Sequence, residues 1–579
     1  MATESVIHPV LLIGLGCLVL PMLPKRSRGL AFLLFPLAAL WVCWNLPANR
    51  SFRIEFLEYH LLVFEVDRLS RIFGIIFSLI TFAGGVFAVH LRDISQQVAA
   101  LLYAGSALGV VFSGDWFSLF VFWELMALSS TILILARKDK ERGVEVGLRY
   151  LLVHLFGGSL LVAGILLHVH ESGSILIDLL DSHQFSSWLI VTGVALNAAI
   201  PPLHAWLSDA YPRATVTGAV FLSAFTTKSA VYLLVRVAPG WEVLVVMGVI
   251  MALYGVVFAV LANDVREILA YHIISQVGYM VTGVGIGTEL ALNGTVAHAF
   301  SHILYKSLLF MGVGVVLQVT GRSRLTELGG LAKQIPVTLW LYMVGAFSIS
   351  GFPLFNGFIS KSMVVSAAGE AQYPVVFLFL TLASVGTFLH TGLKLPYFVW
   401  FGPNRGVRTS RPLLNMHIAM GLVATCCILF GVLPSLLYSE LPHPVNHQPY
   451  TSPHLLETIQ LLTATFLGFW WYRFKLSGEP TLTLDMDWFY RRPTSWLRCY
   501  LVDWIRQQFD TLDVRLLSAS RWLSLRFNTP SLGIRRGLVR SGQSPSTHYD
   551  PDAVWPRLEF VVGLILVTVL LFSVAAALR

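Results

Sequence analysis

The sequence is poor in charge. Only 12% of its 579 residues are Asp, Glu, Lys or Arg, whereas 56% are hydrophobic. Soluble domains carry about 25% charged residues. A soluble chain of this length would form several domains with charged surfaces, so the shortage of charge excludes an ordinary soluble enzyme. The chain is therefore expected to use the lipid bilayer as its solvent.

Cysteine and acidic residues are also scarce. The five cysteines contain no Cys-x-x-Cys pair, so neither a metal site nor a disulfide framework is indicated, and we expect this chain to hold no metal and no cofactor. The 32 acidic residues are outnumbered by 40 basic ones, for a net charge of +8. In a membrane protein, an excess of basic residues indicates which loops face the cytoplasm rather than a nucleic-acid-binding surface.

Long apolar runs, in contrast, are abundant. A helix that crosses a bilayer core of about 30 Å needs about 20 mostly apolar residues. The sequence contains sixteen such runs, at residues 6–22, 30–46, 69–89, 97–112, 116–136, 148–168, 188–209, 214–237, 242–262, 267–286, 292–319, 336–369, 375–400, 413–436, 454–472 and 558–577. Lys and Arg concentrate in alternate connections between them, which predicts both termini on the non-cytoplasmic side.

The segment from about residue 474 to 557 interrupts this pattern. From Trp496 to Phe527, apolar residues recur at helical spacing with charged residues between them. This predicts an amphipathic helix of roughly 30 residues on the cytoplasmic surface, followed by a loop at 528–552. The helix either anchors the chain to that surface or braces a neighbouring subunit.

A few ionisable residues lie inside the apolar runs, where each costs at least about 2.5–3.5 kcal/mol. They are Glu124, Lys228, His298, His302, Lys306, Lys361 and Lys394. His298, His302 and Lys306 recur every four residues, so one helix face carries three titratable groups over about 12 Å. Imidazole titrates near neutrality and a desolvated lysine can release its proton, which suits a proton relay. Polar bonding between helices is the simpler alternative.

Two runs contain helix breakers at comparable places. Pro201 and Pro202 interrupt one, and Gly351 and Pro353 interrupt another, five runs further along. Because a unit of five spans inverts its successor across the membrane, the fourth to eighth and ninth to thirteenth spans are predicted to form an inverted pair. A structural proline kink is the simpler interpretation of either break alone.

These motifs resemble those of the antiporter-like subunits shared by respiratory complex I, Mrp-type cation/proton antiporters and membrane-bound hydrogenases. The resemblance covers roughly residues 60–440 and depends on FWELM, PLHAWLSDAYP, DVREILAYHIISQVGYM, HAFSHILYKSLLF and GFPLFNGFISK. LDMDWFYRR at residues 484–492 is most similar to the D-type Mrp antiporter protein and its hydrogenase counterpart, where a lateral helix braces adjacent subunits.

The resemblance implies an all-α polytopic fold with fourteen core helices, two inverted five-helix repeats that each contain a broken helix, a lateral helix and a final transmembrane helix. The expected organisation is N-terminal helices at 1–96, repeats at 97–237 and 242–400, C-terminal core helices at 413–472, the lateral helix and loop at 485–540, and the final span at 558–577.

The resemblance also implies an axis of buried charged residues through which protons cross. By position, Glu124 resembles a glutamate that modulates a nearby lysine, and Lys228 the lysine that joins the two halves. His298, His302 and Lys306 resemble the central relay, and Lys361 the lysine of the second broken helix. Auxiliary residues of the proton path are Asn197, His204, His390 and Lys394.

The sequence departs from the family pattern at the first broken helix. Asn197 stands where the family normally has a lysine, and an amide neither gains nor loses a proton in the physiological range. Either Lys228 or water takes over this role, or the first half-channel is inactive. Ser208 replaces the proline expected in a WLPDA motif.

The leading hypothesis is a proton-translocating subunit, without a redox centre of its own, in a multisubunit complex of the bacterial inner membrane. Transport is coupled to Na⁺ or K⁺ exchange, or to a quinone oxidoreductase or hydrogenase elsewhere in the complex. The expected partners are other membrane subunits, the transported ions and the lipid bilayer, with no nucleic acid. One alternative is a scaffold with an inactive first half-channel, and another is a redox enzyme that holds quinone or ligates haem through His154, His168, His170 and His390.

Overall fold

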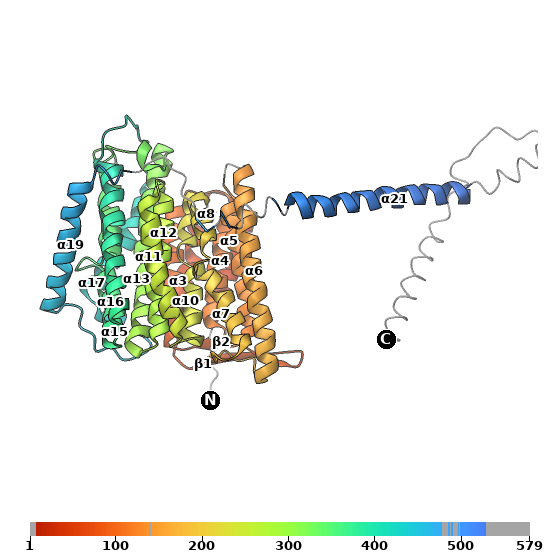
Figure 1. Cartoon of the computed structure of the whole chain (residues 1–579), viewed down its shortest axis with the longest axis horizontal. Coiled ribbons are helices and arrows are strands. Elements are labelled where there is room, and N and C mark those ends of the chain that lie inside the picture. Colours follow the sequence, from red (N-terminus) through yellow and green to blue (C-terminus); the bar gives the residue numbers. More distant parts are fainter. Residues whose placement is uncertain are drawn as a thin grey trace, which may run out of the picture. The chain divides into compact units, whose positions relative to one another are not determined.

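The computed structural model describes residues 7–137, 140–477, 485–486, 488–489, 496 and 498–528. The chain divides into two compact units after Asp487. The first is a bundle of helices that stand side by side (Figure 1). The second contains π-helix η6 (Arg498–Val502) and helix α21 (Asp503–Asn528), which confirms the helix predicted there. The predicted final span, and the predicted loop beyond residue 528, lie outside the described residues.

The helices of the first unit follow the predicted apolar runs. In chain order the elements are α1 (Pro9–Val19), η1 (Leu20–Met22), α2 (Arg28–Asn45), β1 (Arg50–Phe56), β2 (Tyr59–Val66), α3 (Arg68–Ala88), α4 (Ile94–Phe112), α5 (Trp116–Leu135), α6 (Lys140–Ser172), α7 (Phe185–Asn197), α8 (Ala205–Ala210), η2 (Tyr211–Arg213), α9 (Val216–Leu222), α10 (Thr226–Val237), α11 (Glu242–Leu261), α12 (Val265–Ile286), α13 (Glu289–Thr320), η3 (Leu325–Glu327), α14 (Pro336–Ser350), α15 (Asn356–Glu370), α16 (Pro374–Thr387), η4 (Phe388–Lys394), η5 (Tyr397–Phe401), α17 (Leu414–Val432), α18 (Ser435–Tyr438) and α19 (Ser452–Tyr472). The chain is mostly helical, as predicted.

Eleven helical segments in the described part are long and apolar enough to cross a membrane. Each coincides with one of the predicted spans. Among the others, the run 6–22 gives only the 11-residue α1 and a 3₁₀ turn, and the runs 188–209 and 336–369 are interrupted. Helix α19 has 21 residues but is not among the eleven, because polar residues such as His454 and Glu457 occupy its first turns.

Both predicted helix breaks are confirmed. The chain leaves helical geometry at residues 198–204, between α7 and α8, and at 351–355, between α14 and α15. Proline lacks a backbone N–H and cannot continue an α-helical hydrogen-bond ladder. At each break one residue other than glycine adopts the left-handed region, Ala199 with φ 59° and Leu354 with φ 74°. The inverted relation of the two halves stays a prediction.

Three irregular features accompany the predicted helices. The span 214–237 is interrupted at residues 223–225, between α9 and α10, without a proline. The span 375–400 continues from α16 into the π-helical segments η4 and η5, and π-helical turns inside helices often occur at functional sites. Strands β1 and β2 form an antiparallel hairpin in which Phe52 opposes Phe64.

Helix α13 is the central helix of the first unit. It packs against α3, α9 and α10 from the first part of the chain and against α12, α14, α15 and α17 from the second. Its residues from Asn293 to Val316 are buried. The face that carries His298, His302 and Lys306 is therefore enclosed by protein.

Gly357 sets the distance between α14 and α15 at the second break. A Cβ atom on this residue would lie 1.7 Å from the backbone oxygen of Ser348. Because a backbone atom cannot move aside as a side chain does, we expect Gly357→Ala to destabilise the protein by about 3 kcal/mol, the cost of overpacking a tight core.

A lower melting temperature of the purified full-length protein would show this effect. Gly369→Ala on the same helix is the matched control, because its Cβ would meet only the Phe377 side chain at 3.6 Å. Equal melting temperatures for the two variants would contradict the prediction.

Candidate functional site

Except for Glu124, which is half-buried, the ionisable residues predicted within the apolar runs are buried in the bundle. Exposure is 0% for Lys228, His298, His302 and Lys306, 4% for Lys361 and 2% for Lys394. Burying an isolated charge is costly unless other groups replace the lost water or the group becomes neutral. The contacts of each group therefore decide what it can do.

Three of the buried lysines donate to backbone carbonyls where helices end. Lys228 Nζ lies 2.7 Å from the oxygen of Ser223, just after α9, and 3.0 Å from Thr227 Oγ1. Lys394 Nζ lies 2.7 Å from the oxygen of Val260, in the last turn of α11. The carbonyl end of a helix carries partial negative charge, which stabilises an ammonium group.

Lys361 uses the second break in the same way. Its Nζ lies 2.8 Å from the oxygen of Ile349 and 3.3 Å from Ser384 Oγ. In a continuous helix, the N–H four residues after Ile349 would take this carbonyl, but that residue is Pro353 and has no N–H. The break thus provides the acceptor that holds the lysine.

Lys306 differs from these lysines. Among the described residues, no hydrogen-bond partner reaches its Nζ, which lies 6.0 Å from the centre of the Phe310 ring. Both ring nitrogens of His302, one turn earlier, likewise have no partner there. His298 Nδ1 lies 3.2 Å from Ser360 Oγ, and its Nε2 lies 3.4 Å from the Tyr305 hydroxyl.

The structure brings the predicted relay residues together. Lys228 lies within electrostatic range of Lys306 and of both histidines, and Lys361 within range of His298. The rings of His298 and His302 are 6.4 Å apart. We call the five residues Lys228, His302, Lys306, His298 and Lys361 the central axis.

His272 on α12 is a neighbour of the central axis that was not singled out in the sequence. Its ring lies 6.1 Å from that of His390, and it interacts electrostatically with Lys306 and Lys361. It is buried, and neither of its nitrogens has a partner among the described residues. The signal was present in the motif DVREILAYHIISQVGYM, but a single histidine in an apolar run does not reveal which helix it faces.

The first half contains a different arrangement. Asn197, the last residue of α7, lies with its Oδ1 2.8 Å from His154 Nδ1 on α6. His154 is 1% exposed, and its ring packs against Tyr150 and Trp206 at centroid distances of 4.2 and 4.5 Å. A buried imidazole therefore lies directly beside the amide that replaces the family lysine.

Glu124 on α5 packs against α6. A Cβ atom on Gly158 would lie 1.8 Å from Glu124 Oε1, so the absence of a side chain at Gly158 provides the space for this carboxyl group. Lys228 makes its hydrogen bonds to Ser223 and Thr227, and Glu124 is not among its partners.

His204, at the first break, is fully buried. Its Nε2 lies 3.1 Å from an oxygen of Asp485, a residue of the C-terminal segment that the sequence did not single out by itself. No group of three or more His, Cys, Asp or Glu side chains that could hold a metal ion occurs in the described part of the chain.

Sequence comparison identifies known relatives. Residues 113–388 match the family model described as NADH:quinone oxidoreductase/Mrp antiporter, TM. An uncharacterized protein of Methanocaldococcus jannaschii is 29% identical over 59% of this chain and 75% of its own length. The Na⁺/H⁺ antiporter subunit A1 of Staphylococcus haemolyticus is 28% identical over 66% of this chain and 53% of its own length, so the chain spans about half of that relative.

Solved structures share the fold. A chain of the Mrp complex from Dietzia sp. DQ12-45-1b matches with a TM-score of 0.68 and 22% identity, over 79% of this chain and 99% of that chain. A chain of the membrane-bound sulfane sulfur reductase, an archaeal respiratory membrane complex, matches with a TM-score of 0.69 and 20% identity, over 98% and 99% of the two chains. The family match and the eleven apolar helical segments in the described part of the chain identify a multi-pass membrane protein.

Proposed function

We propose that the chain, whose residues 113–388 match the family model described as NADH:quinone oxidoreductase/Mrp antiporter, TM, is a proton-translocating subunit of a multisubunit membrane complex. The observation that carries this proposal is the central axis, a series of buried titratable groups that links α10, α13 and α15. Ionisable residues in this position are costly and mark ion pathways.

The contacts of the lysines suggest how protons move along the axis. Lys228 and Lys361 are each held by a carbonyl oxygen at a helix end, which favours the protonated form. Lys306 has no such partner among the described residues. We propose that Lys306 exchanges protons between the two held lysines, with His302 and His298 as carriers on its own helix.

Water is needed to complete these steps. The 6.4 Å between the rings of His298 and His302 is too long for direct transfer and suits one bridging water. Buried polar atoms without a protein partner are usually satisfied by ordered water. In the described residues such atoms gather near the axis, on His272, Ser301, His302, Lys306, Ser307, Asn356 and His390.

We propose that the driving force for transport comes from chemistry elsewhere in the complex. The chain then operates together with other membrane subunits, because the relatives that it resembles are named as a subunit of an Na⁺/H⁺ antiporter and as chains of respiratory complexes. We also propose that the chain belongs to the D-type branch of the Mrp antiporters, that it lies in the bacterial inner membrane, and that α21 lies on the cytoplasmic side. Proton uptake by everted membrane vesicles tests it, with a Na⁺ or K⁺ gradient or a reduced electron donor as the driving force.

His154 is the residue that we propose to carry protons in the first half, in place of the missing lysine. His154→Gln keeps a group that can bind Asn197 but cannot titrate, and we expect it to lower proton transport by at least about tenfold, as loss of an acid–base group does. His170→Gln on the same helix is the matched control, since His170 is exposed.

Normal transport by His154→Gln would instead favour the scaffold hypothesis for the first half, which the Asn197 amide supports. Under that hypothesis Asn197→Lys also leaves transport unchanged. A loss of transport in both variants, with the His170→Gln control unaffected, would assign proton conduction to this half.

A further inference from the structure

The first break contacts the C-terminal segment through the carboxylate of Asp485. Asp485 lies in the LDMDWFYRR motif, 281 residues after His204 in the chain, yet its side chain is only 6% exposed. His204 Nε2 and the Tyr254 hydroxyl contact Oδ1, while the Tyr271 hydroxyl lies 2.7 Å and Ser208 Oγ 3.1 Å from Oδ2. One carboxylate thus accepts hydrogen bonds from the break, from α8, from α11 and from α12.

These donors keep Asp485 ionised. Burial alone would raise the pKa of this carboxyl group, but the hydrogen bond from His204 and the positive charge that its ring carries when protonated, followed by the Tyr254 and Tyr271 hydroxyls, hold it well below its usual range. A carboxylate accepts hydrogen bonds and does not donate them. His204 must therefore present an N–H at Nε2, which leaves Nδ1 as the nitrogen that can take up a proton.

His204 Nδ1 is buried and has no partner among the described residues. The remaining side of the ring packs edge-on against Tyr254, with ring centroids 4.6 Å apart. A carboxylate that binds one nitrogen of a histidine fixes its tautomer and orientation and stabilises the imidazolium form. The pair has the geometry of a proton acceptor held in one position.

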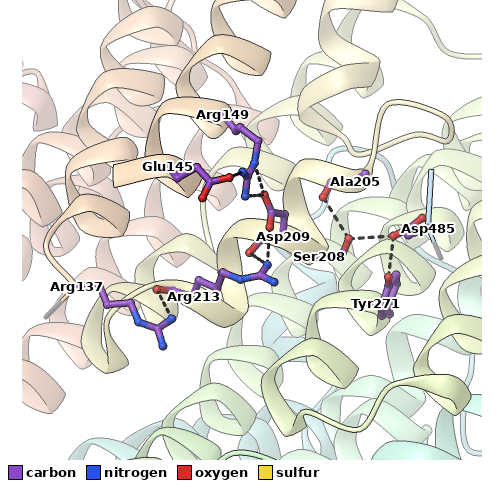
Figure 2. A network of polar contacts seen from close by, with 9 residues as sticks. All are labelled: Arg137, Glu145, Arg149, Ala205, Ser208, Asp209, Arg213, Tyr271 and Asp485. Atoms are coloured by element: carbon purple, nitrogen blue, oxygen red, sulfur yellow. Dashed lines mark hydrogen bonds and ion pairs between the residues drawn. The ribbon is translucent and has the colours of Figure 1, made fainter. Parts of the chain in front are cut away.

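Ser208 links this arrangement to the departure of the sequence from the family motif. Its hydroxyl reaches Asp485 and shares its proton with the Ala205 carbonyl at 3.2 Å. The proline expected at this position could not donate. On the other side of α8, Asp209 is held by Arg149 and Arg213, so this short helix is fixed on both sides (Figure 2).

We propose that Asp485 is a positioning residue that holds His204 at the first broken helix with Nδ1 free to accept and release protons, so that the C-terminal segment completes the proton path of the first half. This inference depends on the proposed transport function. A proton added at Nδ1 gives an imidazolium whose charge the Asp485 carboxylate balances, and the same proton leaves from Nδ1 to the next carrier. No bond to Asp485 is broken in either step.

The test uses the full-length chain in its native complex, in everted vesicles, and compares Asp485→Asn, His204→Gln and the double variant. We expect each single variant to lower proton transport by about tenfold, the factor that corresponds to one pKa unit. If Asp485 acts through His204, the double variant transports no less than His204→Gln alone. Asp485→Glu should restore part of the activity, and the exposed Asp178→Asn is the control for loss of one carboxylate.

Several outcomes would overturn the inference. Normal transport by Asp485→Asn would do so. Independent losses from Asp485→Asn and His204→Gln that multiply in the double variant would also do so, because they are expected if the contact between the two residues is purely structural. Tyr271→Phe adds a second measurement, because it removes a donor to Asp485 without touching His204. A melting temperature lowered equally by Asp485→Asn and Tyr271→Phe, with transport reduced in proportion to folded protein, would also assign a structural role only.

Failure of the proposed function gives a different result. If the wild-type complex moves no protons, or moves them equally well with Lys306→Ala, the transport proposal itself is wrong. If Lys306→Ala abolishes transport while Asp485→Asn behaves as wild type, only the inference about Asp485 is wrong.

Discussion

Replacing Lys306 with alanine is expected to abolish proton transport, with a loss of about a hundredfold or more. Lys306 is fully buried in the middle of α13, and its Nζ has no hydrogen-bond partner among the described residues. Removing it takes from the central axis a lysine that lies within electrostatic range of both Lys228 and His302. Proton uptake by everted vesicles, normalised to the amount of assembled complex, measures the effect.

Lys306→Arg separates charge from titration. Arginine keeps the positive charge but cannot release its proton in a protein, so we expect it to be as inactive as alanine. Lys333→Ala, in an exposed loop, is the control for loss of one lysine and should transport normally. An active arginine variant would mean that position 306 needs only a fixed charge, and proton relay through this residue would be wrong.

The sequence could predict the axis because its evidence is local. A charge inside an apolar run is visible without any knowledge of the fold, and the spacing of His298, His302 and Lys306 places them on one helix face. The breaks at Pro201 and Pro353 are equally local, since proline interrupts the backbone ladder wherever it stands. These predictions needed only composition, periodicity and the chemistry of single residues.

The parts that could not be predicted depend on tertiary contacts. His154 lies 43 residues before Asn197 in the chain, and nothing in its own apolar run indicates that it faces that amide. Asp485 stands in a polar segment where an acidic residue is ordinary, and only the folded structure brings it to His204. The interruption at residues 223–225 contains no proline, so the sequence did not predict that the helix ends there and exposes a carbonyl oxygen that binds Lys228.

The contacts of Glu124 illustrate the same limit. The family resemblance implied that it acts on a nearby lysine, and a sequence gives no distance with which to check this. In the structure its carboxyl group lies over Gly158, a residue that has no chemistry of its own and would not be chosen by any motif. The role of Glu124 in tuning the axis stays a prediction.

Replacing Lys361 with alanine is expected to have an effect as large as that at Lys306, because Lys361 is the last lysine of the central axis. It also lines a cavity together with Ser362, Ser384, His454, Glu457 and Thr465. This cavity lies against α19, and apolar side chains such as Leu461 and Leu462 line it as well. We expect transport to fall by about a hundredfold or more, measured as proton uptake per assembled complex.

A substitution at Ser384, one of the two hydrogen-bond partners of Lys361, provides the matched comparison. Ser384→Ala removes the longer of its two contacts, at 3.3 Å, and leaves the bond to the Ile349 carbonyl at 2.8 Å. A single neutral hydrogen bond contributes about 1 kcal/mol, so this variant should lose no more than about fivefold in transport. If Lys361→Ala and Ser384→Ala were equally impaired, the cavity rather than the lysine would limit transport. If both were active, the axis would end before α15, and protons would have to leave the protein from α13.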